Sequence, residues 1–219
     1  MQYFTFFLWI LLPTYLWAQC NGSDALCNKR YNEVVYVTTH NAFNYEGDFM
    51  FPNQSYPIAQ QLTDGVRAFM LDVYLIDNIP YLYHGFSVLG TQALVEVLTD
   101  MQLFLADNPN EVITIILECY VEATAIADAL NSSNLMPYLH TQVLDEPWPS
   151  LQTMIDNNQR LVLLSDVADS SYDWYHYMWD YAVETDYSNH ALSDLTCDFN
   201  RGQANNELFI LNSFITSAA

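Results

Sequence analysis

Basic residues are scarce in this sequence. Its 219 residues include 26 aspartates and glutamates but only five lysines and arginines, which gives a formal net charge of -21. Because binding to a phosphate backbone requires clustered lysine and arginine, this composition excludes nucleic acid as a partner. It also disfavours electrostatic docking on an anionic membrane surface. Most of the acidic residues are expected to keep an extracellular protein soluble.

Internal repeats, low-complexity tracts and linkers are also lacking, so a chain of this length is expected to form one domain with a sizeable core, at 19–219. Residues 1–18 are apolar and aromatic and predict a secretory signal peptide, although basic residues are missing at its start. The alternative is an uncleaved anchor, against which Pro13 and the short apolar run argue. No later segment has membrane-spanning length. We therefore expect a secreted, extracellular protein.

Cysteine is limited to four residues, a number that suits an oxidising compartment. Cys20 and Cys27 lie in one polar loop, so a local disulfide is the expected pairing. Cys119 and Cys197 could form a second bridge, although four cysteines allow three connectivities. Weak support for secretion comes from three N-glycosylation sequons, which begin at Asn21, Asn53 and Asn131.

Four apolar segments each end in polar residues, and this pattern organises the chain. The segments are 34–39 before His40 and Asn41, 65–71 before Asp72, 79–83 before His84, and 112–117 before Glu118. Their β-branched and aromatic content predicts buried strands. Because a parallel α/β barrel carries its chemistry at the carboxyl ends of its strands, these polar side chains are expected to meet at one mouth.

The remaining segments complete an α/β pattern. Apolar spacing predicts helices at 58–62 and 92–106, a helix within 121–141, and another near 151–157. Two more strands are expected at 160–165, which ends at Asp166, and at 208–215. Residues 41–56 are expected to form a long loop at the mouth. The aromatic stretch 172–187 could form an interfacial or sugar-binding rim, although helix packing is its more common role. The protein could also make peripheral contact with a membrane.

Two histidines at one mouth suit general acid–base catalysis, because the imidazole pKa lies near neutrality. His40 and His84 are therefore the candidate catalytic pair. Asn41, Asp72 and Glu118 would add the oxygen ligands that hard divalent cations prefer. With so few basic residues, such a cation could supply the positive charge that a bound phosphodiester requires.

Some polar side chains have simpler explanations. Arg67 is a candidate for phosphate contact, but alternation places it on the opposite strand face from Asp72, so a structural salt bridge explains it equally well. A lone histidine after a strand is more often a surface or structural residue. Only the position of several such residues at successive strand ends favours a shared site.

At these residues the sequence resembles the phosphatidylinositol-specific phospholipase C superfamily of phosphodiesterases, in its X-domain-like form. The similar motifs are Thr39-His40-Asn41-Ala42-Phe43, Asp64-Gly65-Val66-Arg67 with Leu71-Asp72, Tyr83-His84-Gly85, and Asn108-Pro109-Asn110-Glu111-Val112 through Leu117-Glu118. Two further motifs, Pro147-Trp148-Pro149-Ser150-Leu151 and Arg160-Leu161-Val162, resemble its secreted branch in microbial eukaryotes. The resemblance covers roughly residues 20–216.

The resemblance implies a distorted TIM-type (β/α) barrel and a phosphoric diester hydrolase or lyase acting on a phospholipid or a related small phosphodiester. In that family a neighbouring inositol hydroxyl attacks phosphorus, which gives a cyclic phosphate and releases diacylglycerol. Carried over by position, His40 would be the general base and His84 the general acid. Asn41, Asp72 and Glu118 would bind a divalent cation, by this resemblance Ca²⁺.

Three departures from the family pattern matter. Met70 stands where calcium-dependent members carry another acidic ligand, and Asp72 stands where metal-independent members carry an arginine. The sequence also provides about six strands, so we expect a barrel truncated before its last two. Alternatives in the same barrel are a sphingomyelinase D-like or glycerophosphodiesterase-like activity. A catalytically inert secreted binding module is the alternative outside enzymology.

Overall fold

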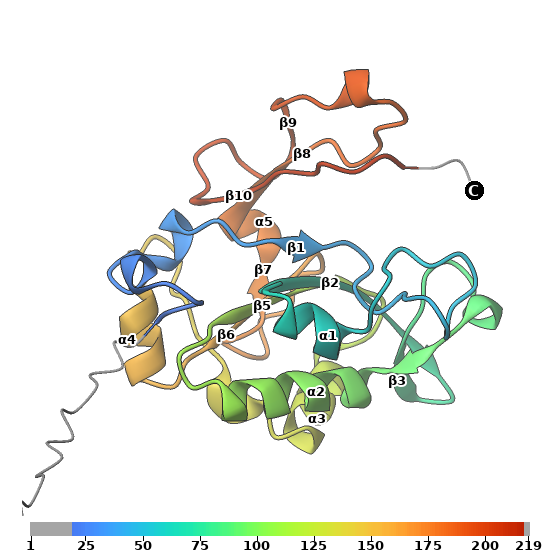
Figure 1. Cartoon of the computed structure of the whole chain (residues 1–219), viewed down its shortest axis with the longest axis horizontal. Coiled ribbons are helices and arrows are strands. Elements are labelled where there is room, and N and C mark those ends of the chain that lie inside the picture. The colour runs from blue at the N-terminus through green and yellow to red at the C-terminus, as the bar shows by residue number, and fades with distance from the viewer. Residues whose placement is uncertain (1–18, 217–219) are drawn as a thin grey trace, which may run out of the picture.

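A mixed seven-stranded sheet forms the centre of the molecule (Figure 1), and the computed structural model describes residues 19–216. The path β4-β3-β2-β5-β6-β7 runs across it, and β1 pairs with the first part of β2. Strands β1, β2, β5, β6 and β7 are parallel, whereas β3 runs antiparallel to its neighbours β2 and β4. The bounds are β1 Thr38–Thr39, β2 Ala68–Ile76, β3 Ile79–Leu82, β4 Gln92–Ala93, β5 Ile113–Cys119, β6 Leu161–Ser165 and β7 His176–Tyr177.

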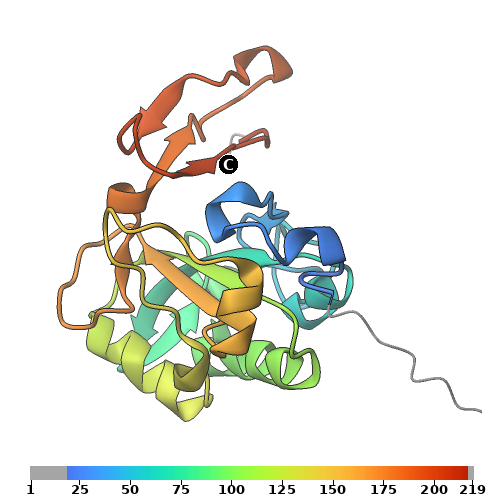
Figure 2. The same ribbon diagram turned by 90° about the vertical axis from the view of Figure 1, so that its left-hand side faces the viewer.

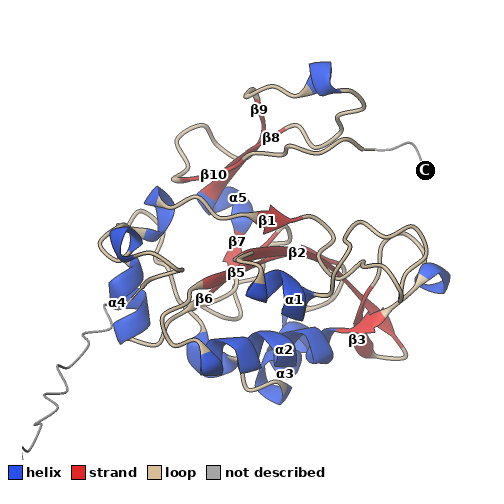
Figure 3. Ribbon diagram, in the orientation of Figure 1, coloured by secondary structure: helices blue, strands red, loops and turns tan. Residues whose placement is uncertain are grey.

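Helices α1 Ile58–Thr63, α2 Leu94–Asp107 and α3 Ala123–Ser132 pack on one face of this sheet (Figure 3). Helix α4 Leu151–Asp156 and the short α5 Met178–Tyr181 belong instead to a second apolar cluster, with Ile116 and Leu164 of the opposite face. Outward side chains of β2, β5 and β6, such as Phe69, Ile115 and Leu163, pack with Met101 of α2 and Ile126 of α3 in the main core. Burial of these apolar side chains is the main stabilising term of the fold. The predicted α/β class is confirmed.

The opposite face of the sheet borders a cavity of about 840 Å³. Ala68, Met70, Thr114, Ile116 and Leu164 face it, which is the alternation predicted for these strands. The extended segment 31–40 and the C-terminal segment 207–214 form its other walls. The described sheet does not close into a barrel.

A second, three-stranded sheet stands beyond α5, above the main sheet in Figure 2. It has the order β10-β8-β9, with β8 at Ala182–Thr185, β9 at Phe199–Arg201 and β10 at Leu208–Ile210. The strand predicted at 208–215 therefore exists only over three residues, and it pairs with β8 rather than with the barrel strands. The strand predicted at 34–39 is likewise reduced to β1. Residues 34–37 are not part of a strand, although the Val37 carbonyl accepts the N–H groups of Arg67 and Ala68, and Val35 is 96% exposed.

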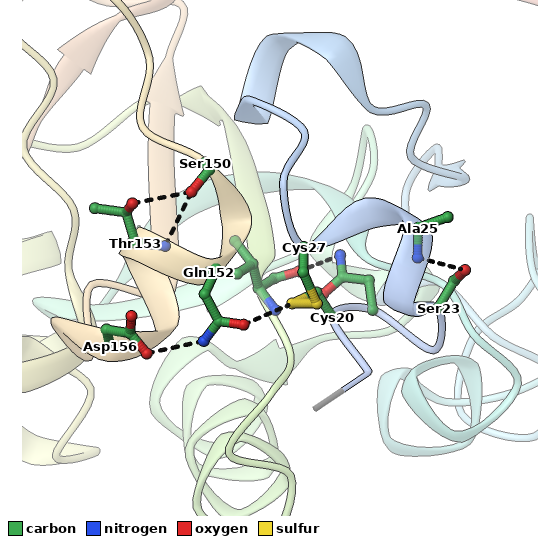
Figure 4. The surroundings of a disulfide bond; sticks show 10 residues. Cys20, Ser23, Ala25, Cys27, Ser150, Gln152, Thr153 and Asp156 are labelled. Carbon is green, nitrogen blue, oxygen red and sulfur yellow. Dashed lines mark hydrogen bonds between the residues drawn. A yellow bond between two sulfur atoms is a disulfide. The ribbon is translucent and has the colours of Figure 1, made fainter. Parts of the chain in front are cut away.

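The predicted Cys20–Cys27 disulfide is present and closes the N-terminal loop (Figure 4). This loop is anchored to α4, since the Gln152 N–H donates to the Cys27 carbonyl at 3.0 Å. The second bridge that we considered, Cys119–Cys197, is wrong. Cys119 is buried at the end of β5, whereas Cys197 lies exposed in the loop before β9, and both thiols are free.

Candidate active site

Three carboxylates lie close together on adjacent parallel strands. The prediction that Asp72 ends its strand is wrong, because β2 continues to Ile76, and Asp72 lies within β2 near the end of its pairing with β5. The β2–β5 register pairs Asp72 with Glu118, and Asp166 directly follows β6. Asp72 and Glu118 continue the strand faces that border the cavity, because each lies two residues beyond a cavity-lining side chain, Met70 or Ile116. The sequence prediction that acidic residues meet at this edge therefore agrees with the fold.

These carboxylates repel one another. Asp72 is only 5% exposed. Burial, followed by the charges of Glu118 and Asp166, raises the pKa of Asp72 to about 8. Burial also raises the pKa of Asp166, while the Cys119 N–H, which donates to its Oδ1 at 2.8 Å, opposes that shift. A buried carboxylate in such a field is stabilised by a proton or by a bound cation.

His40 and His84 lie close enough for their charges to interact. His40 follows β1, its carbonyl accepts a hydrogen bond from Gln54 Nε2 at 2.6 Å, and its ring stacks on Phe214 at 4.4 Å. Burial and then the charge of His84 lower the pKa of His40, while Glu118 opposes this shift. His40 Nδ1 is buried without a hydrogen-bond partner among residues 19–216. A neutral imidazole with an unused nitrogen can accept a proton.

The loop after β1 also fixes Asn41. Its backbone is left-handed, with φ of 46°, and the next residue, Ala42, donates its N–H to the Met70 carbonyl at 3.0 Å. The Asn41 amide nitrogen donates to Asn53 Oδ1 at 3.2 Å, but its own Oδ1 is buried and has no partner within the described part of the chain. A buried amide oxygen without a donor has a free-energy cost unless a ligand satisfies it.

Arg67 does not join this group. It directly precedes β2, whereas Asp72 lies in the middle of that strand. Its Nε lies 2.6 Å from a Glu111 carboxylate oxygen, and its Nη1 donates to the carbonyls of Leu62 and Val66. The placement of Arg67 in the catalytic set is therefore corrected, and the structural salt bridge is the interpretation that the contacts support.

A stack of three tyrosine rings lies beside Glu118, at the mouth formed by Asp72, Glu118, Asp166 and the two histidines, and it was not predicted. The Tyr74 ring lies between Tyr83 at 4.1 Å and Tyr120 at 4.3 Å, and the Tyr120 hydroxyl donates to the Glu118 carboxylate. Two of these rings could have been found by extending the alternation of Asp72 and Glu118 by one step, to Tyr74 and Tyr120. The stack itself depends on strand register, which the sequence did not supply.

The donor set fits a hard divalent cation chemically. Asp72 and Glu118 supply carboxylate oxygens that form no salt bridge within residues 19–216, and Asn41 supplies the unsatisfied amide oxygen. Met70, which borders the cavity, contributes no oxygen. Between residues 19 and 216, no three His, Cys, Asp or Glu side chains are grouped closely enough to hold a metal ion by themselves. The Asn41 amide would therefore have to complete the set.

Curated relatives are similar to most of this chain. The chain is 29% identical over 211 residues to a PI-PLC X domain-containing protein of Arabidopsis thaliana, with 85% of this chain and 49% of the relative covered. PI-PLC X domain-containing protein 1 of Arthroderma benhamiae is 24% identical, with 92% and 70% covered. An uncharacterized secreted protein of that fungus is 25% identical, with 86% and 44% covered. The chain thus spans about half the length of the plant protein and of the secreted protein.

Solved structures share the fold. A phosphatidylinositol-specific phospholipase C from Staphylococcus aureus superposes with a TM-score of 0.54 at 17% identity, over 68% of this chain and 53% of that one. Across residues 19–216, no helix has both the length and the apolar character needed to cross a membrane. The family model described as PI-PLC X 1 matches residues 26–218, nearly the whole chain. This chain therefore belongs to the PI-PLC X domain family.

Proposed function

We propose that this protein is a secreted phospholipase C-like phosphodiesterase in which His40 is the general base and His84 the general acid. His40 takes the proton of an attacking hydroxyl as its oxygen bonds to phosphorus. The bond from phosphorus to the leaving alcohol then breaks, and His84 gives that oxygen a proton. With a neighbouring hydroxyl of the head group as nucleophile, the product is a cyclic phosphate.

The observation that carries this proposal is the closeness of His84 and Glu118 to the buried His40, on which both of their charges act. Burial and the His84 charge keep His40 neutral near pH 7, the form that a general base requires. His84 follows β3 on an exposed turn, where it can exchange its proton with solvent between turnovers.

A divalent cation, which we propose to be Ca²⁺, would be held by Asn41, Asp72 and Glu118. When bound, it would supply positive charge to the phosphate oxygens. The same cation would offset the repulsion between Asp72 and Glu118 and satisfy the unpaired Asn41 Oδ1. The family resemblance supports calcium, and the oxygen-only donor set supports a hard cation.

Two loops beside His84 support contact with a lipid surface. Met50 donates its N–H to the Leu89 carbonyl at 2.7 Å, which joins the loop after β1 to the loop after β3. Phe51 is 80% exposed, Phe86 73% and Val88 83%. Because the chain is so acidic, peripheral membrane contact would have to use apolar side chains of this kind rather than basic ones.

Secretion is part of the proposal. The predicted signal peptide, residues 1–18, lies outside the described residues. Support comes from the Cys20–Cys27 disulfide, which is typical of oxidising compartments, and from the relative described as a secreted protein.

The test is phosphorus NMR of phosphatidylinositol vesicles incubated with the secreted protein, with calcium and with chelator. We expect a cyclic inositol phosphate signal that requires calcium and that is lost in His40→Ala and His84→Ala. His190→Ala is the matched control, since His190 is an exposed histidine in the C-terminal part of the chain, and should retain activity.

Other outcomes separate the alternatives. A cyclic or linear product from sphingomyelin, a lysophospholipid or a glycerophosphodiester, with none from phosphatidylinositol, would change the substrate and leave His40 and His84 in their roles. Turnover in the presence of chelator would show that the reaction does not require the proposed cation. No turnover of any lipid by protein shown to be folded would contradict the enzymatic function and favour an inert binding module.

A further inference from the structure

Arg201 occupies an unusual setting in the C-terminal sheet. Its guanidinium carbon lies 4.5 Å from the centre of the Trp179 ring and 4.4 Å from that of Tyr187. Its Nε forms an ion pair with the carboxylate of Glu184, whose side chain is buried. Among residues 19–216, neither terminal nitrogen of Arg201, Nη1 or Nη2, has a hydrogen-bond partner. The side chain of Arg201 is 46% exposed.

The backbone is built to hold this arginine. Gly202 has φ of 86°, and a Cβ there would lie 2.0 Å from the Ala182 carbonyl oxygen, so only glycine permits β9 to approach β8 so closely. Asn206 Nδ2 donates to the carbonyls of Trp179 and Ala182, which fixes the connection after β9. The second oxygen of Glu184 accepts a hydrogen bond from Asn212 Nδ2 at 3.1 Å. The guanidinium plane is therefore set before any ligand arrives.

Strand register places Arg201 at the same end of the sheet as the three carboxylates. Ser165 of β6 pairs with Tyr177 of β7, so Asp166 and the Trp179 ring that covers Arg201 both lie just past the carboxyl ends of these parallel strands. The charge of Arg201 also acts on Asp166, since it opposes the rise in the pKa of that carboxyl.

The other lysines and arginines lie away from the three carboxylates. Arg67 is paired with Glu111 before β2, and Arg160, before β6, donates to the carbonyls of Asn108, Glu111 and Leu105. Lys29 and Arg30 belong to the disulfide-closed N-terminal region, where the Lys29 carbonyl accepts the Leu151 N–H. Arg201 alone, of the five, is positioned to meet an anion that enters the mouth.

We propose that Arg201 is the anion contact of the mouth and that it binds phosphate oxygens of the substrate through Nη1 and Nη2. A planar guanidinium held between two rings offers parallel donors that match the geometry of phosphate. The identity of the substrate rests on the proposed function, but the binding of phosphate by Arg201 does not require turnover. The competing explanation is that Arg201 only neutralises the buried Glu184.

The two explanations separate in a double variant. Arg201→Gln alone leaves Glu184 buried and unpaired and could unfold the C-terminal sheet. Glu184→Gln with Arg201→Gln removes both charges together. Inorganic phosphate would be the probe, with Kd measured by calorimetry in chelator on protein whose circular dichroism matches the wild type. Arg201→Lys keeps the charge without the planar fork, and Arg30→Gln is the control for general electrostatics.

We expect the double variant to bind phosphate about tenfold or more weakly than the wild type, because a charged bidentate contact is lost. Arg201→Lys should show an intermediate Kd, and Arg30→Gln an unchanged one. A wild-type Kd in the double variant, or no detectable binding of phosphate by the wild type, would overturn the proposal. A loss of binding in a protein that also turns over no lipid would leave Arg201 as the anion contact and contradict only the enzymatic function.

Discussion

The two ends of the central strands differ in how their charges are satisfied. At the amino ends, Arg67 is paired with Glu111, and Arg160 donates to three backbone carbonyls. Near the carboxyl ends, Asp72 is buried beside Glu118 and Asp166, and, of the lysines and arginines among residues 19–216, only Arg201 acts on this group, through Asp166. His40 Nδ1 and Asn41 Oδ1 also lack partners there, among the residues described.

This difference separates an end of the sheet where charges are paired from an end where polar groups are left unsatisfied. Paired charges and satisfied carbonyls stabilise the amino ends. Repelling carboxylates and unpaired polar atoms have a free-energy cost at the carboxyl ends, and such costs persist in proteins mainly where a ligand or substrate removes them. Substitutions at the two ends should therefore affect different measurements.

The largest effect is expected at the carboxyl ends, on activity. His40→Ala should lower kcat for phosphatidylinositol by roughly a hundred- to ten-thousandfold, because a positioned general base is lost. Its free energy of unfolding should change by only about 1 kcal/mol, since His40 contributes one ring contact, to Phe214. Kinetics and urea denaturation would measure the two quantities. A large loss of stability with unchanged kcat would show that His40 stabilises the fold and does not act in catalysis.

The largest effect on stability is expected at the amino ends. Arg160→Met should lower the free energy of unfolding by about 3 kcal/mol, because it leaves buried carbonyls without donors. Activity per folded molecule should stay at the wild-type value. Urea denaturation with kinetics on the same samples would check this, with Lys29→Met as an exposed control. A stability equal to wild type would show that the contacts of Arg160 contribute little.

The third prediction concerns the pH dependence of the repelling carboxylates. Because folding raises the pKa of Asp72 from its ordinary value to about 8, the folded state holds this proton more tightly than the unfolded state. The group therefore stabilises the fold at low pH, and this contribution is lost as pH rises from about 4 to about 8. Asp72→Asn should remove the loss, on the order of 5 kcal/mol.

Urea denaturation in chelator, near pH 5 and near pH 8, measures this difference. The variant should gain stability over the wild type at the higher pH and much less at the lower one. Calcium added near pH 8 should stabilise the wild type and not Asp72→Asn, because only the wild type retains the carboxylate. Equal stability–pH profiles for the two proteins would show that folding does not raise the pKa of Asp72.

The sequence predicted the parts of this mouth that follow from local pattern. Apolar runs with two-residue alternation placed Asp72 and Glu118 beside each other on one sheet face, as the register confirms. The same alternation separated Arg67 from Asp72. These predictions succeeded because they require only the two-residue periodicity of a strand, which can be recognised in a single sequence.

The parts that failed depend on contacts between distant segments. The sheet of β8, β9 and β10 has strands of three or four residues, too short for a periodic signal, and its assembly requires Gly202 to pass close to Ala182. A disulfide between Cys119 and Cys197 was considered, but Cys119 ends β5 with its thiol buried in the core. There the thiol donates to the Val121 carbonyl. Neither outcome has a local signature.

The smallest predicted effect tests how closely the carboxyl ends are organised. The Tyr120 hydroxyl donates to Glu118, and its ring stacks on Tyr74, so Tyr120→Phe removes one hydrogen bond and keeps the stack. Because Tyr120 is 56% exposed, water can replace part of that bond, and kcat/KM should fall only about threefold. Tyr83→Phe, which keeps the other face of the stack and has no bond to Glu118, should leave kcat/KM unchanged. If both variants lose activity equally, the rings rather than the Glu118 contact matter, and the carboxylate needs no partner to hold it at the mouth.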